Sequence, residues 1–233
     1  MLVLGMDTSS QAATAAVLRD GIILGEYTLN HKKTHSVKML PLIEQLLADT
    51  ELTLNDIDVF ACGTGPGSFT GVRIGVATAK GFAQALGKQV VSLNTLEILC
   101  GSLPIFHGLL VPAVFARADE LFCGIYQNQN GLEELLPPCV MTVNELCSYL
   151  QQQNQNCLFV GDGAAVHTEL ITNELKKRAF FAPSHLSMVR GASAALLGYQ
   201  KAMQNGCIPY QELVPLYLRP SQAEREYRKK QRK

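Results

Sequence analysis

The sequence predicts an α/β protein with two lobes and a duplicated fold. Strand-like and helix-like segments follow the order strand, strand, strand, helix, strand, helix, and this order occurs twice along the 233 residues. Apolar residues make up 47% of the chain and charged residues 17%, a composition that supports a sizeable core and excludes a mainly disordered protein. No linker rich in Ser, Pro or charge separates the halves, and the boundary is expected near residues 100–108.

The first half begins with an apolar run that ends at an acidic residue, as expected for a buried strand. The next two strand-like runs are joined by Asp20 and Gly21, a pair typical of hairpins. Thr34 is a candidate N-cap for the first helix, and Pro41 is expected to bend or shorten that helix. Gly87 is expected to end the second helix. The expected strands are 2–7, 12–19, 22–30, 57–63 and 89–93, and the expected helices are 34–47, 71–86 and 94–100.

The second half repeats this order with weaker patterns. Thr142 and Glu145 have the spacing of a capping box at the start of a helix. The stretch 98–116 carries no charged residue, but several Gly and Pro residues interrupt it, so it is not expected to span a membrane. The expected strands are 109–116, 120–127, a weak one at 132–140, and 157–161; the expected helices are 142–152, 164–177 and 191–204.

Charge and cysteine content exclude several classes of protein. The net charge is zero, which argues against a surface devoted to the phosphate backbone of a nucleic acid. The seven cysteines contain no CxxC spacing, so neither a disulfide framework nor a zinc module is expected. A reducing, cytoplasmic location fits best, since the first residues also lack the pattern of a signal peptide. Residues 219–233 carry a net charge of +5, which indicates either a solvated terminus or an anchor for RNA or an acidic partner.

Three turns could bind a nucleotide, and each has a structural alternative. Carboxylate and hydroxyl groups in residues 7–10 are suited to Mg²⁺ and phosphate, although an ordinary hairpin turn explains them too. The glycine-rich turn 63–71 leads from a strand into a helix N-terminus, where anions bind, but it could serve close packing alone. Residues 161–164 form a third such turn. The candidate nucleotide-binding residues are Asp7, Thr8, Ser9, Gly65, Gly67, Gly161 and Gly163.

These turns, in this order, together with the segment 216–220, resemble the TsaB (YeaZ) family. That family is a bacterial branch of the actin, sugar-kinase and Hsp70 superfamily (ASKHA), so the resemblance implies the duplicated ASKHA fold. It covers nearly the whole chain and is strongest from residue 4 to residue 99, including Thr34 to Ser36 and Gly65 to Arg73. Phe115 stands where the family usually has an Asp.

The resemblance also implies a function. TsaB proteins act with TsaD, TsaE and the product of TsaC to place a threonylcarbamoyl group on the adenosine beside the anticodon in tRNAs that read A-starting codons. In that family TsaD carries the catalysis, and TsaB is its partner and scaffold. The resemblance therefore implies a non-catalytic subunit that binds TsaD, TsaE and, through the complex, tRNA, with a homodimer as a further state and no membrane contact. It implies no cofactor of its own, and it leaves open ATP or ADP with Mg²⁺ at the partner interface.

The residues themselves bear on catalysis. TsaD-type proteins hold a metal with a His-x-x-x-His pair at a place where this chain has Thr95 and Leu99, so no metal site is expected there. His31 and His35 have a similar spacing but lack the Glu of a zinc-protease motif, and solvent-facing side chains are expected. No Ser, Cys or Thr can be matched to a His and a carboxylate, so no catalytic residue is predicted. A stand-alone kinase or ATPase of the same fold remains the alternative, and a metal-dependent peptidase is a more distant one.

The predicted organisation places the partner-binding helices in the first lobe. Residues 1–103 form that lobe, residues 104–218 a diverged second lobe, and residues 219–233 a basic tail. Small residues recur every four positions along the second helix, where they either admit a partner helix or pack on the protein's own sheet. The residues expected at the partner interface are Val37, Leu40, Glu44, Leu47, Gly71, Gly75, Ala79 and Ala83.

Overall fold

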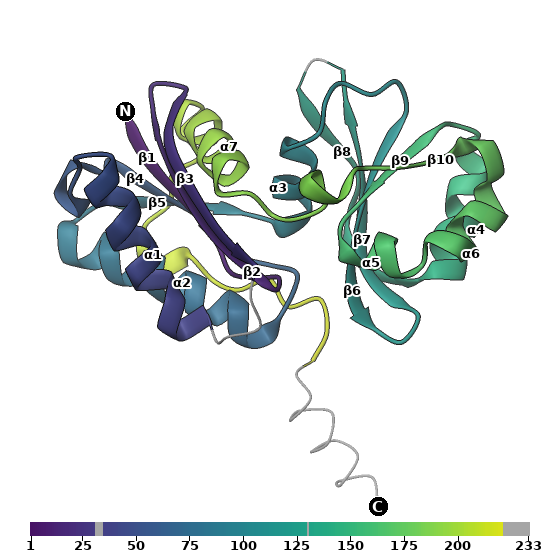
Figure 1. Ribbon diagram of the computed structural model, residues 1–233, viewed down its shortest axis with the longest axis horizontal. Helices are drawn as coiled ribbons and strands as arrows, with labels where there is room; N and C mark the ends of the chain where they lie inside the picture. Colours follow the sequence, from purple (N-terminus) through teal and green to yellow (C-terminus); the bar gives the residue numbers. More distant parts are fainter. Residues whose placement is uncertain (31–34, 130, 221–233) are drawn as a thin grey trace, which may run out of the picture.

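Two five-stranded sheets with helices on their faces form two lobes (Figure 1). The computed structural model describes residues 1–30, 35–129 and 131–220, with backbone alone for residues 35–37. The strand order is β3-β2-β1-β4-β5 in the first sheet and β10-β9-β6-β7-β8 in the second. In each sheet three consecutive strands pair antiparallel, and the fourth strand lies parallel to the first of them. The two lobes therefore have the same topology, and the predicted two-lobed α/β fold is confirmed.

The first lobe follows the expected order of elements closely. Asp20 and Gly21 take positive φ in the hairpin between β2 and β3, and Gly87 ends α2 in the left-handed conformation. Ser68, one residue before α2, caps it by accepting a hydrogen bond from the Gly71 N–H. Its elements are β1 (Leu2–Asp7), β2 (Ala12–Arg19), β3 (Ile22–Asn30), α1 (His35–Asp49), β4 (Val59–Gly63), α2 (Phe69–Leu86), β5 (Gln89–Leu93) and α3 (Thr95–Gly101).

The second lobe differs from the prediction at two places. The helix expected at 164–177 is two helices, because the backbone leaves the helical region at His167. The short strand β10 was not predicted. The capping box of Thr142 and Glu145 is confirmed. The elements of this lobe are β6 (Leu109–Arg117), β7 (Glu120–Asn128), β8 (Leu132–Thr142), α4 (Val143–Gln153), β9 (Cys157–Val160), α5 (Asp162–Val166), α6 (Thr168–Leu175) and β10 (Ala179–Phe181), and α7 (Gly191–Met203) follows them in the chain.

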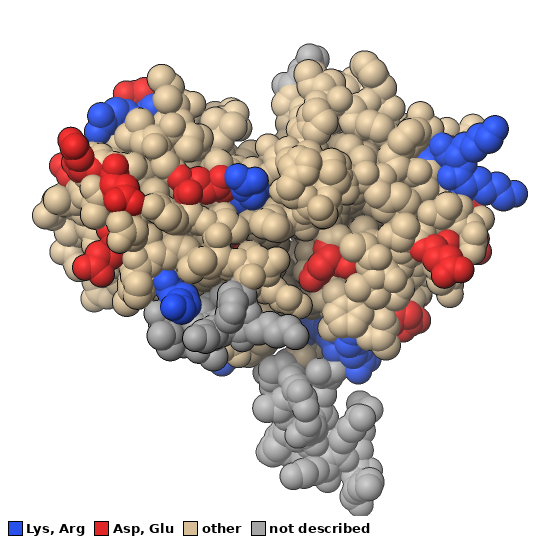
Figure 2. All heavy atoms as spheres, viewed as in Figure 1, with Lys and Arg blue, Asp and Glu red and all other residues tan. Residues whose placement is uncertain are grey.

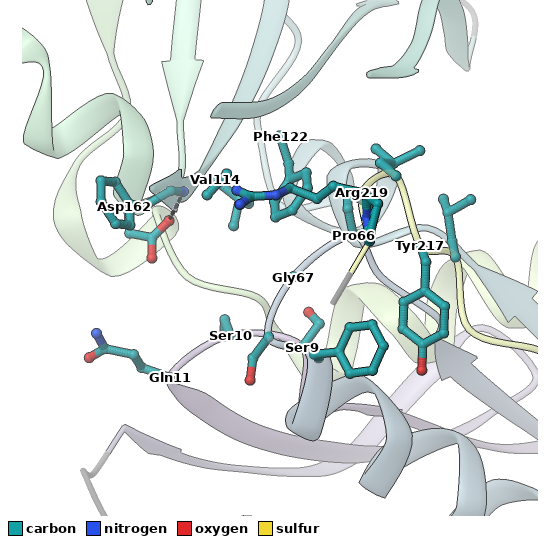
Figure 3. A pocket seen from close by; sticks show the side chains of 17 residues that line it. Ser9, Ser10, Gln11, Pro66, Gly67, Val114, Phe122, Asp162, Tyr217 and Arg219 are labelled. Atoms are coloured by element: carbon teal, nitrogen blue, oxygen red, sulfur yellow. Dashed lines mark hydrogen bonds between the residues drawn. The ribbon is translucent and has the colours of Figure 1, made fainter. Parts of the chain in front are cut away.

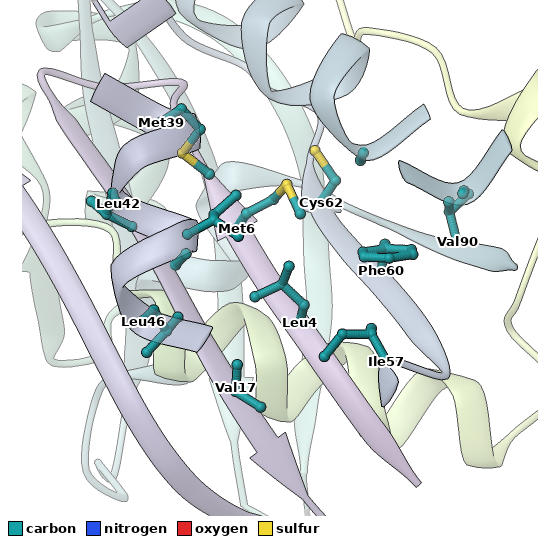
Figure 4. Close-up of a cluster of buried hydrophobic side chains, with 14 of the residues drawn as sticks. Leu4, Met6, Val17, Met39, Leu42, Leu46, Ile57, Phe60, Cys62 and Val90 are labelled. Carbon is teal, nitrogen blue, oxygen red and sulfur yellow. The ribbon is translucent and has the colours of Figure 1, made fainter. Parts of the chain in front are cut away.

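Apolar side chains fill three large clusters. In the first lobe, Met39, Leu42 and Leu46 of α1 pack on Leu4 and Met6 of β1 (Figure 4). A second cluster joins residues of both sheets with α3, so that the two lobes share a continuous apolar contact. A third cluster lies between the second sheet and the helices α4 and α6. The lobes are thus held together by buried side chains as well as by the chain connections.

The end of the chain returns to the first lobe. Helix α7 packs on β1, β2 and β4, and Gly198 lies so close to Ala61 of β4 that a Cβ would come within 2.2 Å of the Ala61 side chain. Ile208 then forms a bridge with Val90, and Leu213 is buried in the first core. The expected second lobe of 104–218 is therefore too long, because α7 and the residues after it pack on the first sheet. No helix among the described residues is long and apolar enough to cross a membrane.

Candidate functional site

A cleft of about 470 Å³ lies between the lobes (Figure 3). Its walls come from the turn after β1, the turn before α2, the strands β6 and β7, and the segment after Leu213. On the face seen in Figure 2, acidic and basic side chains lie on both sides of the junction between the lobes. The lining residues are Ser9, Ser10, Gln11, Pro66, Gly67, Ser68, Phe69, Val114, Phe115, Ala116, Phe122, Asp162, Leu216, Tyr217, Leu218, Arg219 and Pro220.

The acidic residue at the end of β1 is buried beneath this cleft. Asp7 is fully buried, and its Oδ1 accepts hydrogen bonds from the backbone N–H and the hydroxyl of Ser9, both at 2.7 Å. The Thr95 hydroxyl contacts the other carboxylate oxygen at 3.5 Å and donates to the Ser9 hydroxyl at 2.8 Å. Burial raises the pKa of Asp7 to about 6, against the lowering effect of these hydrogen bonds. Asp7 is not among the residues that line the cleft, and its role as a Mg²⁺ ligand stays a prediction.

The glycine-rich turn packs tightly against the turn after β1. The Ser68 N–H donates to the Ser9 carbonyl at 2.7 Å, and the Thr8 hydroxyl donates to the Gly71 carbonyl at 2.7 Å. A Cβ at Gly67 would lie 2.2 Å from the Ser9 carbonyl oxygen, and a Cβ at Gly71 would lie 2.0 Å from that of Thr8. Close packing therefore requires these two glycines. Of the predicted residues in the two turns, Ser9 and Gly67 reach the cleft, whereas Asp7, Thr8 and Gly65 do not line it.

The segment after Leu213, residues 214–220, covers the N-terminal end of α2. The Leu216 N–H donates to the Thr64 carbonyl at 2.7 Å, and the Tyr217 ring stacks on Phe69 with centroids 4.2 Å apart. The Arg73 Nε donates to the Tyr217 hydroxyl at 2.8 Å. Further along, Arg219 pairs with Glu120 of the second lobe at 3.1 Å. The segment thus spans the cleft and packs on Phe69, the first residue of α2, beside the turn where the sequence predicts an anion.

The turn after β9 serves packing as well. Gly161 has φ of +107°, and a Cβ there would lie 2.5 Å from the Ala113 carbonyl oxygen. A Cβ at Gly163 would lie 2.6 Å from the Leu121 side chain. Between them, Asp162 is exposed and accepts a hydrogen bond from the Phe115 N–H at 3.0 Å. Gly161 lines a smaller pocket of about 130 Å³ beside Leu99, whereas Gly163 lines neither pocket.

The positions compared with the metal-binding histidines of TsaD-type proteins are both buried. Thr95 has its hydroxyl engaged with Asp7 and Ser9, and Leu99 lies in the core shared by the lobes. Among the described residues, no group of three or more His, Cys, Asp and Glu side chains could hold a metal ion. His31 and the side chain of His35 lie outside the described residues, as do residues 221–233 of the basic tail.

The small-residue stripe predicted for partner docking faces the protein's own core, so this part of the prediction is wrong. Gly71, Gly75, Ala79 and Ala83 are buried, and a Cβ at Gly75 would lie 2.7 Å from the Thr8 hydroxyl oxygen. The alternative interpretation, packing on the protein's own sheet, is the one the structure supports. On α1, Leu47 is also buried, Leu40 and Glu44 are exposed, and the side chain of Val37 is not described.

A second set of small residues lies on the exposed side of α2. Ala77, Gly81 and Ala85 recur every four residues, and a Cβ at Gly81 would meet nothing within 4 Å. Helix α1 lies in contact with α2 over the same face of the first sheet (Figure 1). On α1, Leu40 is 53% exposed. We call the exposed residues Leu40, Pro41, Glu44, Ala77, Gly81 and Ala85 the helix face.

Fold and cleft together define a class of protein. Two lobes of the same sheet topology, with a cleft between them and the last helix returned to the first lobe, have the predicted duplicated fold of the actin-like, sugar-kinase-like and Hsp70-like class. A Pseudomonas aeruginosa protein described as similar to the peptidase YeaZ has this fold, with a TM-score of 0.80 at 24% identity over 94% of this chain and 99% of that chain.

Sequence comparison assigns the family. The family model for TsaD, tRNA N6-adenosine threonylcarbamoyltransferase, matches residues 22–227. The Bacillus subtilis tRNA threonylcarbamoyladenosine biosynthesis protein TsaB is 32% identical over 97% of this chain and 98% of its own length. The TsaB of Haemophilus influenzae is 30% identical over 94% of both chains. The chain therefore belongs to the TsaB family of tRNA threonylcarbamoyladenosine biosynthesis proteins.

Proposed function

We propose that this protein is the non-catalytic docking subunit of a complex with a TsaD protein that modifies tRNA with a threonylcarbamoyl group. TsaE and tRNA join through the assembled complex, in the cytoplasm. The exposed helix face is the observation that carries the proposal. A stripe of the small residues Ala77, Gly81 and Ala85 admits another helix at short distance, and Leu40 on the neighbouring helix α1 supplies an exposed apolar side chain.

The nature of the partner follows from the family comparison. This chain matches the TsaD family model over residues 22–227, so a TsaD protein has a first lobe of the same plan. Two such lobes that meet through their α1 and α2 helices form a four-helix contact. A second copy of this chain offers the same helices, so we expect self-association to compete with binding of TsaD.

The cleft supports an accessory function. Asp7 is buried and paired with Ser9 and Thr95, and the segment 214–220 lies in front of α2. Phe115 lines the cleft, where the family usually has an acidic residue. We therefore propose that the chain needs no nucleotide or metal of its own, and that any ATP or ADP with Mg²⁺ binds where the partner completes the site.

Replacement of Gly81 by arginine tests the proposal. The new guanidinium side chain would project from the exposed stripe into an approaching helix, and a charge stranded in an apolar contact costs several kcal/mol. The fold should survive, because glycine costs about 1 kcal/mol against better helix formers in an exposed helix. Gln152→Arg, on the exposed side of α4 in the second lobe, is the matched control.

Titration calorimetry with the TsaD protein of the same organism measures the effect. We expect wild type and Gln152→Arg to bind alike and Gly81→Arg to bind at least 100-fold more weakly with an unchanged melting curve. If Gly81→Arg is folded and binds TsaD as tightly as wild type, the docking surface does not include the helix face and the proposal fails. Sustained ATP turnover by the chain alone would favour a stand-alone ATPase instead.

A further inference from the structure

Two cysteines lie opposite each other on neighbouring strands of the second sheet, in a place that the proposed function does not use. Cys123 of β7 and Cys139 of β8 are directly opposite in the antiparallel register, and their Sγ atoms are 3.9 Å apart. Opposed residues in such a ladder have Cα atoms about 4.5–5.5 Å apart, which is within the span of a disulfide. All seven cysteines of the chain lie in the described residues, and all are free thiols.

The two thiols are not equivalent. Cys123 is fully buried, whereas Cys139 lies on the edge strand β8 and is partly exposed. The two sulfur atoms are within hydrogen-bond distance and either can be the donor, while the Cys139 thiol also lies 3.6 Å from the Cys123 carbonyl oxygen. A hydrogen bond from Cys123 lowers the pKa of Cys139, and the same contact together with burial raises the pKa of Cys123. Burial alone raises the pKa of Cys207, which has no such neighbour. Since the thiolate is the reactive form, Cys139 is the more reactive of the pair.

We propose that Cys139 and Cys123 form a peroxide-sensitive pair that closes into a disulfide within the chain. The Cys139 thiolate attacks one oxygen of hydrogen peroxide, so that an S–O bond forms and the O–O bond breaks. The hydroxide that is released takes up a proton and leaves as water. The sulfur is thereby oxidised by two electrons to the sulfenic acid. The Cys123 sulfur then attacks this sulfur, an S–S bond forms, and the hydroxyl leaves as water with the Cys123 proton. A dithiol reductant restores both thiols.

A disulfide between Cys123 and Cys139 would link the edge strand β8 covalently to β7. Among the strands of the described residues, β8 pairs with β7 alone, and the register between the two is irregular just after Cys123. The disulfide closes the loop 123–139 and so restricts the unfolded chain. The oxidised protein is therefore expected to unfold at a higher urea concentration than the reduced protein. The helix face lies on α1 and α2 of the other lobe, so partner binding is not required for this effect (Figure 1).

Peptide mapping of the full chain tests the proposal. Reduced protein is treated with a small excess of hydrogen peroxide, remaining thiols are alkylated, and the chain is digested with a glutamate-specific protease. Trypsin is unsuitable, because residues 118–175 contain no Lys or Arg. Cleavage at Glu120, Glu133, Glu134 and Glu145 places Cys123 in the peptide 121–133 and Cys139 in the peptide 135–145. We expect these two peptides joined, and separated again by a dithiol.

Single variants assign the two steps. In Cys123→Ser, peroxide should leave a sulfenic acid on the peptide 135–145, which dimedone traps. In Cys139→Ser, Cys123 should stay reduced and the rise in urea midpoint after peroxide should vanish. Cys207→Ser, a partly buried cysteine elsewhere, should behave as wild type. The proposal fails if Cys123 and Cys139 remain fully alkylatable after peroxide treatment of wild type, or if Cys139 is no more reactive than Cys207.

Discussion

Replacement of Asp7 by asparagine should stabilise the protein in a pH-dependent manner. Asp7 is fully buried, and burial raises its pKa from an ordinary value of 3.8 to about 6. Asparagine has the same shape, keeps an oxygen for the two Ser9 donors, and presents an amide to the Thr95 hydroxyl. The variant therefore removes the buried charge with little change in packing.

The sign follows from proton linkage. The folded state binds the Asp7 proton more tightly than the unfolded state. Below about pH 4 both states are protonated, so the burial of Asp7 does not lower the free energy of unfolding. Between about pH 4 and pH 6 the unfolded state loses the proton first, and the free energy of unfolding falls. Above about pH 6 the free energy of unfolding falls no further. A pKa difference of about two units between the folded and unfolded states corresponds to a loss of about 3 kcal/mol.

Urea unfolding at several pH values measures this effect. Far-UV circular dichroism is the suitable probe, because the chain contains no Trp. The free energy of unfolding of Asp7→Asn minus that of wild type should be about 3 kcal/mol larger at pH 7.5 than at pH 4. Glu133→Gln, at an exposed carboxylate on β8, is the control for removal of a carboxylate from the protein surface. A difference between Asp7→Asn and wild type that is the same at both pH values would refute the reasoning about burial.

Three further predictions concern α2, the basic tail and metal content. Gly75→Ala should destabilise the fold by about 1 kcal/mol, because the new Cβ would lie 2.7 Å from the Thr8 hydroxyl oxygen. Gly81→Ala should stabilise the fold by about 1 kcal/mol, because a Cβ there meets no other atom within 4 Å and alanine is the better helix former. Equal urea midpoints of the two variants would contradict the assignment of the buried and exposed sides of α2. Deletion of residues 224–233 should lower the tRNA affinity of the assembled complex and flatten its salt dependence, by about 0.7–0.9 in the log–log slope for each phosphate that the tail neutralises. Filter binding at several salt concentrations checks this, and an unchanged slope means that the tail is only a solvated end. Elemental analysis of the purified chain should find no stoichiometric Zn or Fe, since Thr95 and Leu99 stand at the positions of the expected ligands; one tightly bound ion per chain would overturn this.

Local patterns predicted most of the fold. The hairpin at Asp20 and Gly21, the end of α2 at Gly87 and the capping box at Thr142 are all present, because each depends on residues close in the sequence. The three-residue strand β10 is too short to show a periodicity. The return of α7 to the first lobe depends on packing against β1 and β4, which no local pattern records.

The site was harder to predict because small residues and polar turns do not indicate which segments they pack against. Helix α2 has small residues on two sides. Gly71 and Gly75 are buried and Ala77 and Gly81 are exposed because of how the helix packs on the first lobe, which the spacing of the residues does not reveal. The turn at Asp7 has the composition of a Mg²⁺ and phosphate site, but Thr95 and the close approach of Gly63 bury it. The stacking of Tyr217 on Phe69 joins segments far apart in the sequence, so no spacing could reveal it.

Reconstitution of the tRNA modification tests the central claim most directly. The assay contains tRNA, the threonylcarbamoyl donor made by TsaC, TsaE with ATP, and either this chain, the TsaD protein of the same organism, or both, and modified adenosine is measured by mass spectrometry of the nucleosides. We predict no product with this chain alone, little with TsaD alone, full product with both, and no increase over TsaD alone when Gly81→Arg replaces the wild-type chain. Product formed by this chain without TsaD, or full activity of TsaD without this chain, would contradict the account.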